Sequence, residues 1–149
     1  MRGFLLDTDV ISSLSPTRNA APARFLDWLA QMDGDGRLFL SVVSVHEIEK
    51  GVVLLESKGS KKKASMLRAW LAGLVSTYGD RILGLDATGA SLSGQLEAKA
   101  IATGHSPGMA DAIVAGIAAA QSLTVITFNT KHFLPFGVLV ASPDEVTMR

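Results

Sequence analysis

The sequence contains no cysteine, which excludes disulfide bridges, thiolate metal sites and cysteine nucleophiles and agrees with a reducing compartment. It also lacks an excess of either charge, because 14 Lys and Arg residues balance 14 Asp and Glu residues. A balanced chain gives no general signal for nucleic-acid binding, although a local basic patch is compatible with it.

Long apolar runs are absent as well. The run at residues 4–6 is too short for the core of a signal peptide, and Asp7 and Asp9 interrupt it. The apolar stretches at residues 112–120 and 133–141 are shorter than a membrane span. We therefore expect a soluble, cytoplasmic protein with no membrane association. Its 149 residues, 48% of them hydrophobic, fit a single domain over residues 1–149.

Short apolar runs alternate with helical patterns along the chain. Strands are predicted at residues 3–6, 38–43, 81–85, 123–127 and 138–141. Helices are predicted at residues 10–14, 22–32, 44–58, 61–75, 86–104 and 109–120. Ser44 is predicted to cap its helix, with Glu47 at the spacing of a capping box. This alternation predicts an α/β fold with a mainly parallel sheet.

Polar side chains follow the predicted strands at the edge where α/β sheets bind ligands. Asp7 and Asp9 follow the first strand, Glu47 follows the second, and Asn129 follows the fourth. Asp111 lies in the first turn of the helix before the fourth strand. Crowded carboxylates repel one another, and a divalent cation such as Mg²⁺ or Mn²⁺ relieves that repulsion. The pattern therefore predicts a metal site of the kind that nucleases use.

Each of these acids also has an ordinary structural explanation. Asp7 is compatible with a turn after a strand, Glu47 with a capping box, and Asp111 with a favourable charge near a helix N-terminus. The functional hypothesis depends on their occurrence together, and on Asp7 following a buried strand directly.

Four motifs in order resemble the PIN-domain ribonucleases, in particular the VapC-type toxins of bacterial toxin–antitoxin pairs. They are LLDTDVIS (residues 5–12), SVVSVHEIEKG (41–51), MADAIVAGIAAAQSLTVIT (109–127) and TFNTKHF (127–133). The resemblance implies a three-layer PIN-like fold, with a four- or five-stranded sheet flanked by helices. It also implies endoribonuclease activity with Mg²⁺ or Mn²⁺, a cognate VapB-type antitoxin, and a homodimer.

The resemblance assigns roles residue by residue. Asp7, Glu47 and Asp111 match the three central metal-binding acids, and Asn129 matches the polar residue after the fourth strand. Two positions after the fourth strand depart from the family pattern: His132 stands where a fourth acid is usual, and Phe128 stands where Arg is usual. Asp9, where the family usually has Asn, is either a tolerated neighbour or a partial substitute for the missing acid.

Further residues are candidates for supporting roles. The hydroxyl groups of Thr8, Ser44 and Thr127 are suited to hydrogen-bond the acids or a bound water. The one basic cluster consists of Lys61, Lys62, Lys63 and Arg68, which either contacts RNA phosphates or forms a solvated helix start.

Two other functions compete with the ribonuclease hypothesis. A non-catalytic PIN-like module would bind RNA or a protein in the same groove, and His132 favours this alternative. A receiver-like phosphoacceptor is less well supported, because its central Asp and late Lys are matched only by Asp86 and Lys131.

Overall fold

A parallel sheet forms the centre of the molecule. The structure is a computed structural model that describes residues 2–148. Within these residues the sheet has five short strands in the order β3-β2-β1-β4-β5, and each strand is parallel to its neighbours. The strands are β1 (Phe4–Leu6), β2 (Leu38–Ser41), β3 (Ile82–Leu83), β4 (Thr124–Ile126) and β5 (Val140–Ala141). The predicted α/β fold with a parallel sheet is confirmed.

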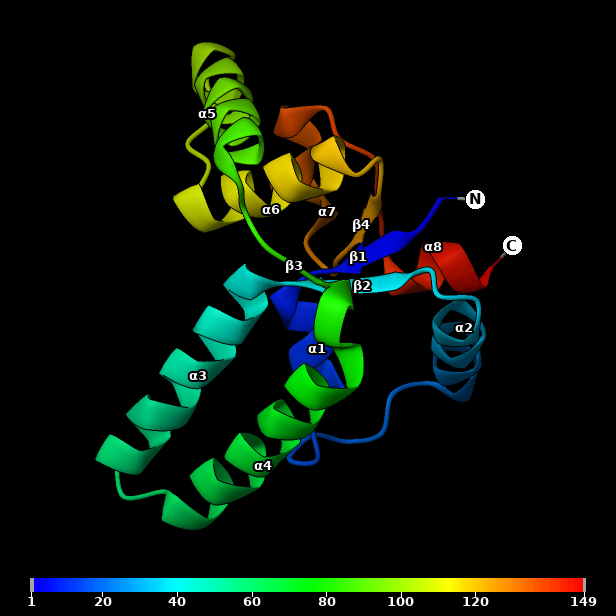
Figure 1. Cartoon of the computed structure of the whole chain (residues 1–149), viewed down its shortest axis with the longest axis vertical. Helices are drawn as coiled ribbons and strands as arrows, with labels where there is room; N and C mark the ends of the chain where they lie inside the picture. The colour runs from blue at the N-terminus through cyan, green and yellow to red at the C-terminus, as the bar shows by residue number, and fades with distance from the viewer. Residues whose placement is uncertain (1, 149) are drawn as a thin grey trace.

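Helices cover both faces of the sheet. They are α1 (Thr8–Ser13), α2 (Ala23–Gly34), α3 (Val42–Ser57), α4 (Lys61–Tyr78), α5 (Ala87–Ala102), α6 (Met109–Ala120), α7 (Thr130–Phe133) and α8 (Pro143–Thr147), with short 3₁₀ turns η1 (Gly79–Arg81) and η2 (Leu134–Phe136). Figure 1 shows α5, α6 and α7 on one side of the sheet, and the long α3–α4 hairpin with α2 on the other. No helix within residues 2–148 is long and apolar enough to cross a membrane.

The two cores follow from the alternation of side chains along each strand. Leu5 and Val125 contribute to the core beneath α5, α6 and α7. Their neighbours Leu6 and Ile126 contribute to the core on the opposite face. All four side chains are buried. A sheet that is covered on both faces needs continuous apolar strands, which is why the strands read as short apolar runs in the sequence.

The start of α3 differs from the sequence prediction. Strand β2 ends at Ser41, and residues 42–43, predicted as strand, already belong to α3. The Ser41 hydroxyl accepts a hydrogen bond from the Ser44 N–H at 3.4 Å and caps the helix. Ser44 lies inside the helix and is buried, so the predicted Ser44–Glu47 capping box is wrong. The β-branched pair Val42-Val43 resembles a strand locally, but the upstream serine begins the helix.

Two helices near the end of the chain were not predicted. Helix α7 is only one turn long, so it has no sequence period to detect. Helix α8 does carry a signal, because Ser142 and Glu145 form a capping box around Pro143. Its Val146 is buried in the core that also contains Leu6.

Helices α5 and α6 approach each other closely at Gly116. A Cβ atom added there would lie 2.7 Å from Ser93 Cβ and 3.1 Å from the Gly89 carbonyl oxygen. These atoms belong to the tightly packed side of α5, so they cannot move without separating the helices. Only glycine at position 116 permits this close packing of α6 against α5.

We predict that Gly116→Ala lowers the free energy of unfolding by about 1–3 kcal/mol, because the added methyl group overpacks this contact. Gly94→Ala on the exposed side of α5 is the matched control, since a Cβ there meets nothing within 4 Å. The control should raise stability by about 0.5–1 kcal/mol. Urea unfolding measures both, and equal stabilisation by both variants would contradict the close contact.

Candidate active site

Sheet topology brings the sequence-predicted acids to one edge. Strand β1 pairs with β2 on one side and with β4 on the other, so the carboxyl ends of these three strands are adjacent. Asp7 directly follows β1, Glu47 lies on α3 after β2, and Asn129 follows β4. Asp111 lies in the first turn of α6, close enough to Asp7 to affect its ionisation.

Asp7 is the most buried of the acids, with 9% of its surface exposed. One carboxylate oxygen accepts the Thr8 N–H at 2.9 Å, and the other accepts the Thr127 hydroxyl at 2.9 Å. Burial and then the negative charge of Asp9 raise the pKa of Asp7 to about 6, with a smaller contribution from Asp111. The two hydrogen bonds oppose this rise but do not cancel it. The carboxylate therefore occupies a place where added positive charge is stabilising.

Asp9 is tied to the segment after β4. Its Oδ2 atom accepts the Phe128 N–H and the Asn129 side-chain amide, each at 3.1 Å. The Thr127 hydroxyl also lies 3.2 Å from Oδ2. Asp9 thus positions residues 127–129 through hydrogen bonds and acts on Asp7 through its charge.

A chain of hydroxyl groups supports Glu47. The Thr8 hydroxyl lies 2.6 Å from Glu47 Oε1 and 2.8 Å from the Ser44 hydroxyl. Because the Thr8 N–H also binds Asp7, this one residue contacts both acids. Ser44 therefore lies beside the acids, although it does not cap the helix as predicted.

Asp111 lies next to a histidine, at the position where the family usually has a fourth acid. His132 Nδ1 lies 3.7 Å from Asp111 Oδ2, and the imidazole is largely exposed. Burial raises the pKa of Asp111, the nearby His132 opposes this rise, and Glu47 and Asp9 add to it. The position where a fourth acid was expected thus holds a partner for Asp111.

The donor set fits a hard divalent cation in its chemistry. Mg²⁺ and Mn²⁺ favour carboxylate oxygens, and Mg²⁺ commonly uses one or two of them and completes its shell with water and phosphate. Within residues 2–148, no three His, Cys, Asp or Glu side chains are gathered closely enough to hold a metal by themselves. A cation at these acids would therefore need further oxygen ligands from water or substrate.

Open space lies on both sides of the acids. A groove of about 310 Å³ between α1, α3 and α4 is lined by Thr8 and Glu47, and also by Arg18 and Lys63. A second cavity of about 240 Å³ is lined by Asp111, Lys131 and His132. Arg18 and Lys131 were not predicted as site residues, because neither belongs to a charge cluster in the sequence.

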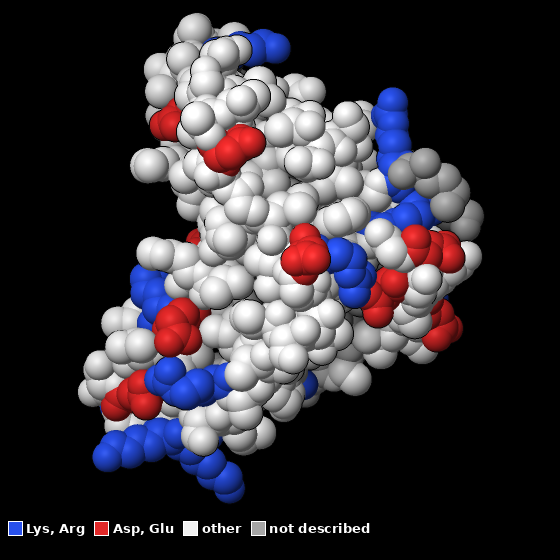
Figure 2. Space-filling view, viewed as in Figure 1, with Lys and Arg blue, Asp and Glu red and all other residues white. Residues whose placement is uncertain are grey.

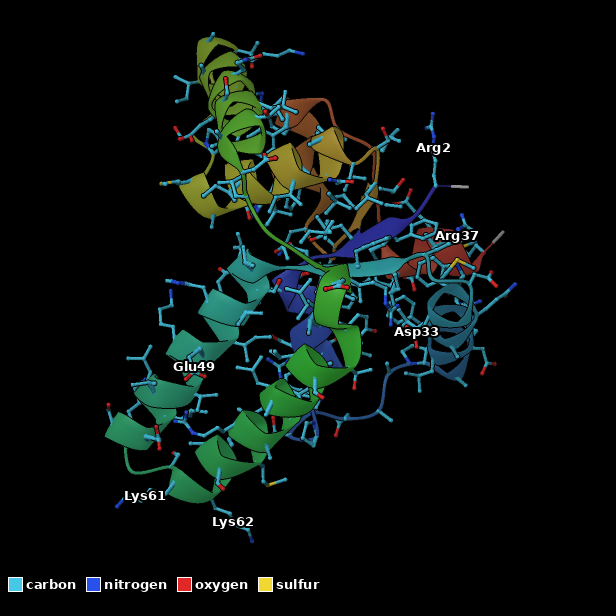
Figure 3. The ribbon with its side chains drawn as sticks, in the orientation of Figure 1. Arg2, Asp33, Arg37, Glu49, Lys61 and Lys62 are labelled. Atoms are coloured by element: carbon cyan, nitrogen blue, oxygen red, sulfur yellow. The ribbon has the colours of Figure 1, made fainter. Side chains whose placement is uncertain are left out.

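The predicted basic cluster is divided by the structure. Lys63 lines the groove beside Glu47. Lys61 and Lys62 lie at the end of the α3–α4 hairpin and point away from the sheet (Figure 3), and Figure 2 shows basic side chains at this end of the molecule. Arg68 forms salt bridges with Glu49 and Glu56, which join α4 to α3. Only Lys63 is therefore close to the acids.

Comparison with known proteins agrees with this geometry. The family model described as "PIN domain" matches residues 4–134. The plasmid stability protein StbB of Pseudomonas syringae pv. tomato is 34% identical over 142 residues, which cover 95% of this chain and 99% of the relative. The toxin FitB of Neisseria gonorrhoeae is 34% identical over 141 residues, which cover 94% of this chain and 97% of the relative.

Solved structures share the same fold. FitAcB from Neisseria gonorrhoeae has a TM-score of 0.80 at 33% identity, covering 94% of this chain and 97% of that one. VapBC2 from Rickettsia felis has a TM-score of 0.74 at 19% identity, covering 93% and 97%, and this likeness concerns the fold alone. The extent of the family match, together with the identity and coverage of these relatives, shows that the chain belongs to the PIN-domain family, among its FitB-like members.

Proposed function

We propose that this protein is a metal-dependent endoribonuclease and the toxin of a toxin–antitoxin pair. The observation that carries this proposal is the buried Asp7 carboxylate, whose pKa of about 6 is raised by its burial and by the charges of Asp9 and Asp111. Such a site favours a cation, and membership in the PIN-domain family supports nuclease chemistry. When bound, Mg²⁺ or Mn²⁺ would lower the pKa of a water and neutralise charge on the phosphate.

The chain's own residues have distinct proposed roles. Asp7 and Asp111 would hold the cation, and Glu47 would complete the acid set. Thr8 and Thr127 orient these acids by the hydrogen bonds described above. Asn129 holds Asp9 in place by donating one N–H of its side-chain amide. Its amide oxygen would orient a water, and its second N–H would contact a phosphate.

RNA is the proposed substrate, and the groove beside Glu47 is its proposed path. Arg18 and Lys63 line this groove and would contact phosphates. Contacts from Lys61 and Lys62 would require RNA that extends along the α3–α4 hairpin. Arg68 would have to leave its salt bridges with Glu49 and Glu56 to join them.

The partners are proposed from the relatives. One relative is the toxin FitB, and related folds were solved as the complexes FitAcB and VapBC2. We therefore propose a cognate antitoxin of the VapB type. A homodimer and action on cytoplasmic RNA are proposed from the family resemblance alone. We also propose that residues 1–149 act as one PIN-like domain, since all five strands in the described range join one sheet.

A non-catalytic binding module is the second candidate. The observation that favours it is His132, which pairs with Asp111 at the position where a fourth acid was expected. Such a module would retain the groove but would not require a cation at Asp7. Metal binding and RNA cleavage, measured separately, distinguish the two candidates.

We predict that Asp7→Asn lowers the rate of Mn²⁺-dependent RNA cleavage by more than about 100-fold. Mutating a residue that only hydrogen-bonds a metal ligand typically costs about 10–100-fold, and Asp7 is proposed to bind the metal directly. Asn at position 7 is neutral, so it cannot supply the negative charge of a carboxylate ligand. Gel analysis of RNA fragments measures the rate, and circular dichroism checks the fold. Asp27→Asn, an exposed change on α2, is the matched control and should cleave as wild type does. Wild-type cleavage by Asp7→Asn would sink the assignment.

We predict that Mg²⁺ or Mn²⁺ raises the melting temperature of the wild type. At a free concentration of a hundred times Kd, binding stabilises a folded protein by about 2.7 kcal/mol. Asp7→Asn should lose most of this shift, because the cation loses a ligand and a negative charge. NaCl at matched ionic strength is the control for screening. Equal shifts in both proteins would favour the non-catalytic module.

We predict that Asp7 destabilises the metal-free protein as pH rises. Its pKa is about 6 in the folded protein and 3.8 as a reference value, so the folded state holds the proton more tightly. The contribution of this bound proton to the free energy of unfolding is complete below about pH 4 and is lost as pH rises through about 6. Asp7→Asn should therefore gain stability relative to wild type between pH 4 and pH 7.5, by an amount on the order of 2–3 kcal/mol. Urea unfolding with a chelator measures this, and a pH-independent difference would contradict it.

A further inference from the structure

Phe128 is an exposed aromatic side chain beside the acids. It is 53% exposed and is the one aromatic residue among the large, exposed hydrophobic side chains of residues 2–148. Single exposed apolar side chains are common on proteins and need no special explanation. Here the position of the residue, between Thr127 and Asn129, makes its exposure informative.

The backbone around Phe128 is held in place by the acids. Its N–H donates to Asp9 Oδ2 at 3.1 Å. The residue before it, Thr127, is fully buried and binds Asp7 through its hydroxyl. The residue after it, Asn129, binds Asp9 through its side chain and Thr127 through its N–H. The aromatic ring is therefore presented from an ordered backbone, so a ligand that uses it does not have to order this segment.

One wall of a small cavity is formed by Phe128. The cavity has a volume of about 150 Å³, and its apolar lining includes Pro22, Phe25 and Pro143. Of these, Phe25 and Pro143 are buried, so this part of the lining is fixed by packing. A flat aromatic face beside proline and phenylalanine walls is suited to a planar apolar ligand.

Polar groups lie at the edge of the same cavity. Asn19 and Arg24 supply hydrogen-bond donors there, and Asp144 supplies acceptors. A nucleobase has this combination of properties, since its faces are apolar and its edges carry donors and acceptors. Proteins recognise unpaired RNA bases by stacking them on aromatic rings and hydrogen-bonding their edges.

We propose that this cavity, which we call the Phe128 pocket, binds a nucleobase of single-stranded RNA, next to the phosphate that a cation at the acids would contact. The proposal rests on the proposed ribonuclease function and adds a base-binding subsite to it. Stacking on Phe128 would supply affinity for any base, while Asn19, Arg24 and Asp144 would supply a preference among bases.

The test uses binding in the absence of cleavage. Every variant is built on the Asp7→Asn background and titrated, in a chelator, against a short fluorescent single-stranded RNA by anisotropy. Phe128→Ala and Phe128→Leu should weaken binding by between about fivefold and a hundredfold, the range for loss of one stacked base. Phe128→Tyr should bind as the parent does, because it keeps the ring. Ile101→Ala is the control, because it removes an exposed apolar side chain on α5, outside the Phe128 pocket. It should leave RNA affinity unchanged.

Each outcome has a defined meaning. Parent-like binding by Phe128→Leu overturns stacking, because apolar area alone would then account for the contact. Parent-like binding by Phe128→Ala, or no RNA binding by any form, overturns the pocket. A change in molecular mass by light scattering with no change in RNA affinity identifies the ring as an interface between copies, which also overturns it. Cleavage by the wild type is scored separately, so that RNA binding without cleavage contradicts only the ribonuclease.

Discussion

The hydrogen bond between the Thr127 hydroxyl and Asp7 joins the ends of two adjacent strands at the place where chemistry is proposed. Asp7 directly follows β1 and Thr127 directly follows β4, so the contact depends on the parallel pairing of these strands. It also depends on the two cores, which bury Leu5 and Leu6 on opposite faces of β1. The apolar strands therefore do more than form a core: they hold a carboxylate where water cannot fully stabilise its charge. The raised pKa of Asp7 is the electrostatic consequence of that folding pattern.

Much of the fold could be predicted from local patterns, because short apolar runs and helical periods alternate clearly. The parallel sheet was predicted, and α6 has the predicted bounds, Met109–Ala120. The start of α3 was mispredicted because Val42 and Val43 favour a strand locally, whereas Ser41 caps the helix in the folded chain. Helix α7 is too short to show a period, while the signal for α8 was present at Ser142 and Glu145.

The positions of the candidate acids at one edge of the sheet could be predicted from the sequence, but the contacts among them could not, and their roles stay a prediction. The position of each acid after a strand identified Asp7 and Glu47, and topology explains why they converge. No sequence pattern could show that Asp9 would accept the Phe128 N–H and the Asn129 amide, because those contacts join residues about 120 positions apart. Nor could the sequence show that His132, which replaces the family's usual fourth acid, would lie beside Asp111.

The Thr127 hydroxyl lies within hydrogen-bond reach of two carboxylates but can donate to only one of them at a time. It has a single proton, yet both Asp7 and Asp9 place a carboxylate oxygen within its reach, at 2.9 Å and 3.2 Å. Whichever carboxylate accepts the hydrogen bond from this hydroxyl, the other carboxylate has an oxygen that receives no hydrogen bond from Thr127. A proton or a cation added between the two carboxylates would therefore change which hydrogen bonds can form at this edge, as well as its charge.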